Sequence, residues 1–135
     1  MASRFSMILI AGIELIVVAA PASAHHAFAA EYDATQPILL NGTVTKVEWT
    51  NPHARFVMKV RDGGGKSASW ELELGSPNVL QREGWSRTSL KPGDQVTVNG
   101  YRAKDGSNLA NARNIRLADG RKVLTGSSAG SAPLQ

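Results

Sequence analysis

The chain has 135 residues, no cysteine and a formal net charge of +4. This length allows one domain with a single core after any leader is removed, and the absence of cysteine excludes disulfides, thiolate metal sites, thiol nucleophiles and cysteine-linked haem. The basic residues never form a run of five or six. The charge therefore indicates a solvated surface rather than a nucleic-acid-binding tail.

The N-terminal segment has the three parts of a secretory signal. Arg4 precedes an apolar run over residues 7–20, and an Ala-x-Ala site ends at Ala24. This order predicts a signal peptide over residues 1–24 and a periplasmic or secreted protein with no membrane span after cleavage. An uncleaved anchor or a buried N-terminal helix is the alternative, since Glu14 weakens the apolar run. An exported domain without disulfides favours the bacterial periplasm.

Residues 25–37 show no sustained period and end at a proline, so we expect an N-terminal arm that enters the domain in an extended conformation. The first strand is expected from about Ile38 to Trp49. Alternate residues of a strand face the same side, and the apolar set switches from one side to the other near Thr45 and Lys46. This switch predicts a β-bulge there.

Two further strands are expected over residues 54–61 and 67–74, because both alternate apolar and polar residues around a glycine-rich turn. The apolar parity, which includes Phe56 and Leu72, is expected to face the core. The residues expected on the exposed outer face are Arg55, Lys59, Arg61, Glu71 and Glu73.

The remaining elements follow from a helix start and three turns. Ser76 and Pro77 begin a short helix that is expected to end near Glu83. Strands are then expected over about 96–102 and 109–117, followed by a short piece at 122–124 and a disordered tail at 125–135. Five strands with one helix between the third and fourth predict a mainly β fold, a small OB-like Greek-key barrel over residues 38–124. Another small antiparallel barrel or sandwich is the alternative.

Several runs are similar to a known family: His25-His26-Ala27-Phe28, Val47-Glu48-Trp49-Thr50-Asn51-Pro52-His53, Glu73-Leu74-Gly75-Ser76-Pro77-Asn78 and Gly100-Tyr101-Arg102-Ala103-Lys104-Asp105-Gly106. With these runs the chain resembles an uncharacterised family of small exported bacterial domains. The resemblance implies a signal peptide and a small β-barrel-like domain, and it implies no activity.

The three histidines of the chain, His25, His26 and His53, are candidate ligands of one metal site. Cleavage after Ala24 would give His25 a free α-amine beside its imidazole, and such nitrogen-rich sites favour copper. Together with His53 this arrangement is a histidine brace. The alternative is that His25 and His26 form a solvated terminus and that His53 packs in its turn.

A second hypothesis is a barrel face that binds an extended ligand without metal. Such a face needs cations beside exposed aromatic rings, and Trp49, Trp85 and Tyr101 are either such platforms or parts of the core. The ligand of an exported module would be a glycan, a small molecule or a protein partner rather than nucleic acid. We expect the mature protein to be a monomer.

No motif in the sequence predicts catalysis. A P-loop and a Gly-x-Ser-x-Gly elbow are both absent from the sequence. Glu71 and Glu73 stand about 7 Å apart along one strand by the ordinary strand rise, and we interpret them as exposed surface charges rather than as an acid/base pair.

Overall fold

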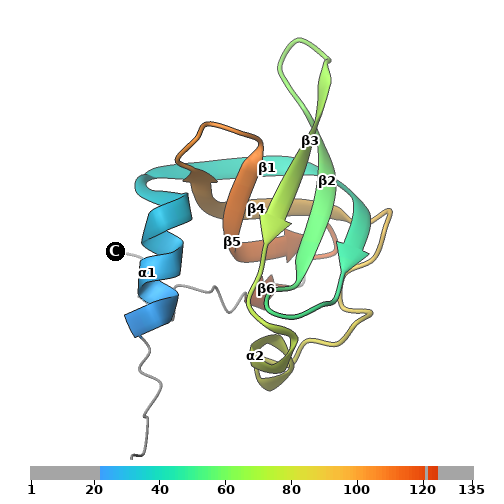
Figure 1. The fold of residues 1–135 in the computed structure, drawn as a ribbon. Coiled ribbons are helices and arrows are strands. Elements are labelled where there is room, and N and C mark those ends of the chain that lie inside the picture. The colour runs from blue at the N-terminus through green and yellow to red at the C-terminus, as the bar shows by residue number, and fades with distance from the viewer. Residues whose placement is uncertain (1–21, 121, 125–135) are drawn as a thin grey trace, which may run out of the picture.

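The computed structural model describes residues 22–120 and 122–124, with side chains described for residues 27–120. The chain forms two helices and six strands in this range (Figure 1). In chain order they are α1 (Ala22–Glu31), β1 (Tyr32–Glu48), β2 (Arg55–Arg61), β3 (Ser67–Glu73), α2 (Pro77–Arg82), β4 (Gln95–Ala103), β5 (Leu109–Leu117) and β6 (Lys122–Leu124).

The five longer strands close into a ring. β1 pairs antiparallel with both β2 and β4, β2 pairs with β3, and β4 pairs with β5. A parallel pairing of β3 with β5 completes the ring, and the short β6 extends it along β5. This order, with α2 between β3 and β4, confirms the mainly β fold and the OB-like arrangement expected from the sequence.

The long strand β1 is bent, and it pairs with β2 along one edge and with β4 along the other. Its pairing with β2 shifts register between Val44 and Lys46, which confirms the predicted bulge. Gly42 lies directly opposite Val60 on β2 and Val96 on β4. A Cβ at Gly42 would lie 2.1 Å from the carbonyl oxygen of Lys59, so only glycine allows the two strands to approach this closely.

The core fills the ring with the apolar parity of each strand. Phe56, Met58 and Leu72 are fully buried, as the alternation predicted. The helix α2 closes one end of the core through Leu80, which is also fully buried. Ser76 caps α2, since its Oγ accepts a hydrogen bond from the backbone N–H of Val79 at 3.4 Å.

The prediction of an extended arm over residues 25–37 is wrong for most of that segment. Residues 22–31 form the helix α1, and β1 begins at Tyr32 rather than at Ile38. Alanine-rich sequence favours a helix, and Phe28 holds it in place because its ring packs against Tyr32 and Tyr101 at centroid distances of 5.5 and 5.9 Å. The predicted signal peptide up to residue 21 and the predicted tail over residues 125–135 lie outside the described residues.

Neither helix in the described part of the chain has the length and apolarity needed to cross a bilayer.

Candidate functional site

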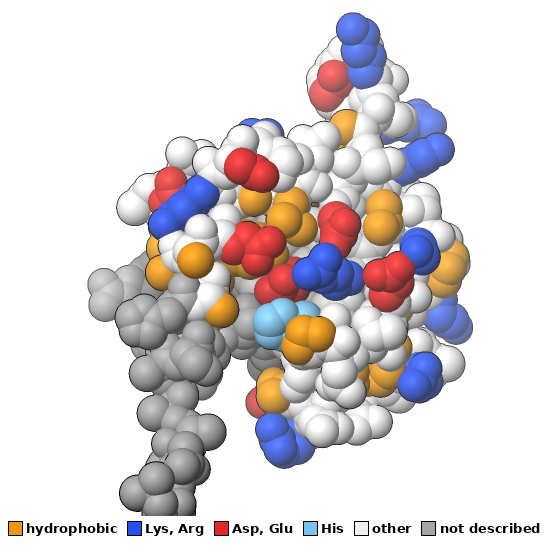
Figure 2. Space-filling view, viewed as in Figure 1, with side chains coloured by type: hydrophobic (Ala, Val, Ile, Leu, Met, Phe, Trp, Pro, Cys, Tyr) orange, Lys and Arg blue, Asp and Glu red, His pale blue; other side chains and the backbone are white. Residues whose placement is uncertain are grey.

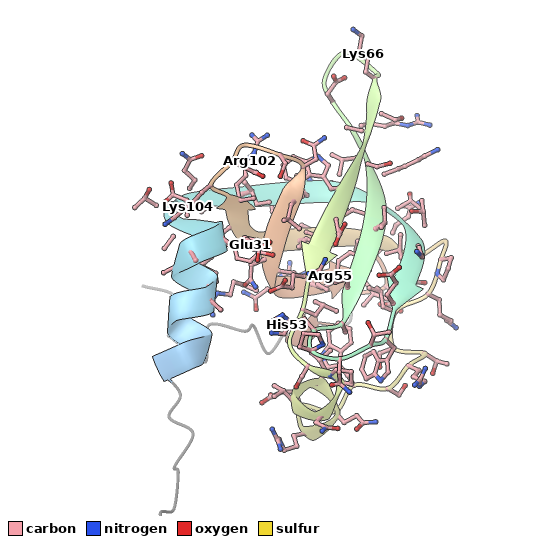
Figure 3. The ribbon with its side chains drawn as sticks, viewed as in Figure 1. Glu31, His53, Arg55, Lys66, Arg102 and Lys104 are labelled. Atoms are coloured by element: carbon pink, nitrogen blue, oxygen red, sulfur yellow. The ribbon has the colours of Figure 1, made fainter. Side chains whose placement is uncertain are left out.

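A charged cluster lies on the outer face of the ring where β2 begins and β3 ends. We use this name for His53, Arg55, Glu71, Glu73 and Tyr32. The guanidinium of Arg55 binds two carboxylates, with Nη1 2.7 Å from Oε1 of Glu71 and Nη2 3.3 Å from Oε2 of Glu73. Arg55 lies over the lower halves of β2 and β3, and His53 lies below it on the side toward α1 (Figure 3). Acidic, basic and histidine side chains gather on this face (Figure 2).

Glu73 does not lie on an exposed surface as the sequence predicted, because only 3% of it is accessible to solvent. The alternation along β3 correctly turns it away from the core, but it stands between two strands of the closed ring. It lies opposite Arg55 on β2 and opposite Asn111 on β5. His53, Arg55 and Tyr32 surround this carboxylate, whereas the side chain of Glu71, which takes part in the same pairing, stays 42% exposed.

Tyr32 contributes a buried phenol to the charged cluster, and the sequence did not predict its burial there. It is 1% exposed at the junction between α1 and β1. Burial raises the pKa of the Tyr32 phenol far above its ordinary value, and the negative charges of Glu73 and Glu31 raise it further. The phenol is therefore neutral at any physiological pH.

His53 precedes β2 and faces the buried carboxylate. Its Nδ1 lies 3.3 Å from Oε1 of Glu73, and its side chain is 29% exposed. The backbone beside it is held by two hydrogen bonds, from the N–H of Ala54 to the carbonyl of Gly75 at 3.0 Å and from the N–H of Leu74 to the carbonyl of Ala54 at 2.8 Å. A carboxylate facing Nδ1 favours the tautomer protonated there, in which Nε2 carries the lone pair.

The other two predicted metal ligands fall in α1. The backbone of His25 and His26 is helical, and their side chains lie outside the described residues. Among the side chains of the described part, no group of three histidines or carboxylates has the geometry to hold a metal ion. The copper site predicted from His25, His26 and His53 therefore stays a prediction.

The aromatic rings considered as binding platforms have different surroundings. Trp85 is 6% exposed and belongs to the core, and Trp49 packs against that core while partly exposed. Tyr101 lies beneath the guanidinium of Arg113 at 5.4 Å and beside Phe28. A ring that the sequence did not single out, Trp70, lies beneath the guanidinium of Arg102 at 5.2 Å.

The three cations predicted on the outer face of β2 do not act together. Arg55 belongs to the charged cluster, whereas Lys59 and Arg61 are exposed at the opposite end of the strand, beside β1 and the start of β3. The outer face of β2 is thus divided between two surfaces of different chemistry.

Fold and site together define a small mainly β module with a charged, partly buried cluster on its outer face. A family model described as "Family of unknown function (DUF6152)" matches residues 12–112. The match covers most of the chain, so the protein belongs to this family. None of the curated proteins compared with the chain matches it.

Proposed function

We propose that this protein is an exported binding module, and that its mature form holds a copper ion through His53 together with the N-terminal histidines His25 and His26. The observation that carries the proposal is the position of Glu73 behind His53. Metal-binding histidines commonly donate one ring N–H to a carboxylate, which orients the ring and makes the other nitrogen a better ligand. The contact between Nδ1 of His53 and Glu73 has this form.

The chemistry of the remaining donors favours copper. Imidazole nitrogens and a terminal amine suit Cu(II) better than the harder cations, which prefer oxygen ligands. Cleavage after Ala24 would supply the amine on His25. Export and cleavage are part of the proposal, and mass spectrometry of the protein recovered from the periplasm tests them by giving its first residue.

The test of metal binding is a Cu(II) titration of the chain that begins at His25. We expect tight binding that is lost in His53→Ala, and we expect Glu73→Gln to weaken it by about 10–100-fold because the ring is no longer oriented. Glu71→Gln is the matched control, since it removes a carboxylate that contacts Arg55 rather than His53. Its affinity should stay near that of the unaltered chain.

A further variant carries one added alanine before His25, which moves the amine off the histidine. We expect this variant to lose most of the affinity. Binding that is unchanged in the extended variant and in His53→Ala would overturn the proposed site, because neither the amine nor the loop imidazole would then be a ligand.

A further inference from the structure

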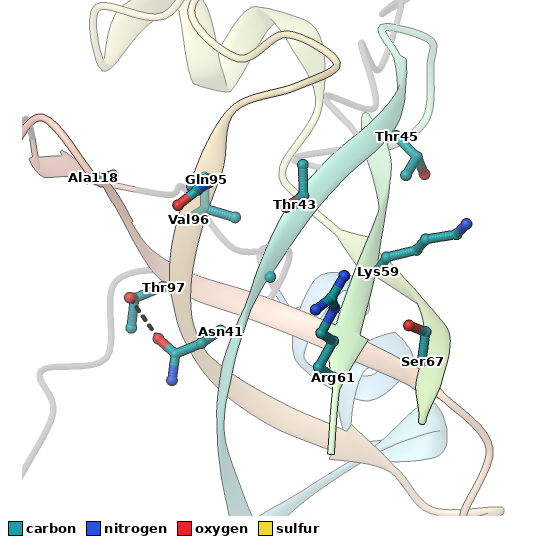
Figure 4. Close-up of a pocket in the computed structure, with 11 residues that line it drawn as sticks. Asn41, Thr43, Thr45, Lys59, Arg61, Ser67, Gln95, Val96, Thr97 and Ala118 are labelled. Atoms are coloured by element: carbon teal, nitrogen blue, oxygen red, sulfur yellow. Dashed lines mark hydrogen bonds between the residues drawn. The ribbon is translucent and has the colours of Figure 1, made fainter. Parts of the chain in front are cut away.

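A second surface, independent of the charged cluster, carries a proposal of its own. The outer faces of β4, β1 and β2 and the start of β3 form a groove of about 730 Å³ around the bend of β1 (Figure 4). Volumes of this size are typical of sites that take small organic ligands. Gly42 lies in this groove and allows the close approach of β1 to β2 that shapes it.

Two cations of the groove lack acidic partners. Lys59 and Arg61 project from the same face of β2, about 7 Å apart by the ordinary strand rise. No carboxylate lies within ion-pair distance of either among the described side chains. Other cations of the sheet are engaged: Lys46 pairs with Glu48, and Arg55 with two glutamates.

Most of the other side chains that line the groove are neutral and can form hydrogen bonds. Asn41 and Gln95 supply amides, and Thr43 and Thr97 supply hydroxyls. The hydroxyl of Thr97 donates to Oδ1 of Asn41 at 2.7 Å, which fixes the amide so that its NH₂ group is left to donate to a ligand. Part of the surface is therefore already oriented before a ligand arrives.

The residue types define the class of ligand. Among the described residues that line the groove, none is acidic and none is aromatic. Without aromatic rings the groove has no platform for stacking bases or sugar rings, so it differs from the aromatic face considered from the sequence and would hold a ligand by charge and hydrogen bonds. Two cations flanked by amides and hydroxyls match a ligand with repeated anionic groups and many hydroxyls. We propose that this groove binds an acidic oligosaccharide, with the carboxylates of neighbouring sugars held by Lys59 and Arg61 and the sugar hydroxyls held by Asn41, Thr43 and Gln95.

The experiment is a calorimetric titration of the metal-free protein with a short oligogalacturonate. We expect binding that weakens as salt is added, and no binding of a neutral glucose oligomer of the same length. Lys59→Ala and Arg61→Ala should each lower the affinity by about tenfold or more, since each removes a charge-assisted hydrogen bond. Lys66→Ala, in the turn between β2 and β3 and outside the groove, removes the same charge and should leave the affinity unchanged.

The neutral donors give a test that does not depend on net charge. Asn41→Ala and Thr97→Val should lower the affinity for the oligogalacturonate while leaving its salt dependence unchanged. Circular dichroism of each variant establishes that it is folded. Because His53 lies outside the groove, His53→Ala should bind the oligogalacturonate normally, so failure of the copper site and failure of this proposal are distinguishable.

Three results would overturn the proposal. One is equal loss of affinity in Lys66→Ala, which would mean attraction to net charge only. Another is binding of polyphosphate or single-stranded DNA as tightly as the oligogalacturonate, which would mean that the sugar hydroxyls contribute nothing. The third is the absence of oligogalacturonate binding to the folded, unaltered chain at low salt.

Discussion

The two ends of β2 present the same kind of side chain in opposite circumstances. At the start of the strand, the guanidinium of Arg55 lies between Glu71 and Glu73, and its side chain is 41% exposed. At the other end, Lys59 and Arg61 are exposed beside neutral polar groups. The first arginine compensates a buried carboxylate, whereas the latter cations are left to interact with solvent or a ligand.

The difference shows that alternation along a strand does not by itself assign a role to an outward-facing charge. All these residues share one parity of β2 and β3, yet the charge of Arg55 is used within the protein. Glu73 is buried among Tyr32, His53 and Arg55, and a buried carboxylate needs a compensating cation, which Arg55 supplies. At the other end of β2 the side chains of Lys59 and Arg61 stay exposed.

The largest expected effect concerns two glycines at which the backbones of neighbouring strands approach closely: Gly42 on β1, in the groove, and Gly100 on β4. A Cβ at Gly42 would lie 2.1 Å from the carbonyl oxygen of Lys59, and one at Gly100 would lie 2.1 Å from that of Asn111. Gly42→Ala and Gly100→Ala should therefore each lower the free energy of unfolding by about 3 kcal/mol or more, measured by urea denaturation. Gly63→Ala is the control, because no atom lies within 4 Å of a Cβ there. An effect of Gly42→Ala no larger than that of the control would mean that β1 bends elsewhere.

An intermediate effect separates the two ends of β2. Arg55→Met keeps the apolar part of the side chain but leaves the buried carboxylate of Glu73 without its cation. We expect it to lower the free energy of unfolding by about 2 kcal/mol. Arg61→Met should change that free energy by less than about 0.5 kcal/mol, as is usual for exposed positions. If urea denaturation gives Arg55→Met and Arg61→Met the same loss of unfolding free energy, the charged cluster and the groove do not differ in how their cations contribute to stability.

The smallest effect concerns the pH dependence of the charged cluster. The pKa of Tyr32 is raised in the folded protein, so above the ordinary phenol pKa of about 10 the unfolded chain loses this proton first. The stability contributed by the neutral phenol is fully present below that pH and is lost as pH rises toward the folded-state pKa. In urea denaturation from about pH 9 to about pH 11, Tyr32→Phe should flatten the decline in stability by up to about 1.4 kcal/mol per pH unit.

Tyr101→Phe serves as the comparison, since Tyr101 lies outside the charged cluster. It should retain the decline shown by the unaltered chain. If Tyr32→Phe retains it as well, the phenol of Tyr32 ionises in the folded protein as readily as in the unfolded chain.

Much of the fold could be predicted from local pattern. The alternation in β2 and β3, the parity change near Thr45 and the Ser76 helix start each depend on neighbouring residues only. The helix α1 was missed because its stability depends on Phe28 reaching Tyr101, which is 73 positions away in the chain and is brought close only by the pairing of β1 with β4.

The candidate site was predicted less completely for the same reason. His53 was identified from its residue type, but its partner Glu73 was interpreted as an exposed charge, and Tyr32 was placed in an extended arm. These residues meet only when β2 pairs with β3 and the start of β1 pairs with the end of β4. Their burial is a property of the closed ring and is not visible in any single segment.

The sequence by itself determined the strand periods, the bulge, the helix cap and the absence of thiol chemistry, because each follows from residues close together in the chain or from composition. Only the tertiary structure decided which outward-facing charges are buried and which stay exposed. That choice depends on contacts between residues far apart in the chain, since Tyr32, His53 and Arg55 surround Glu73 at one end of the outer face while the groove at the other end stays open.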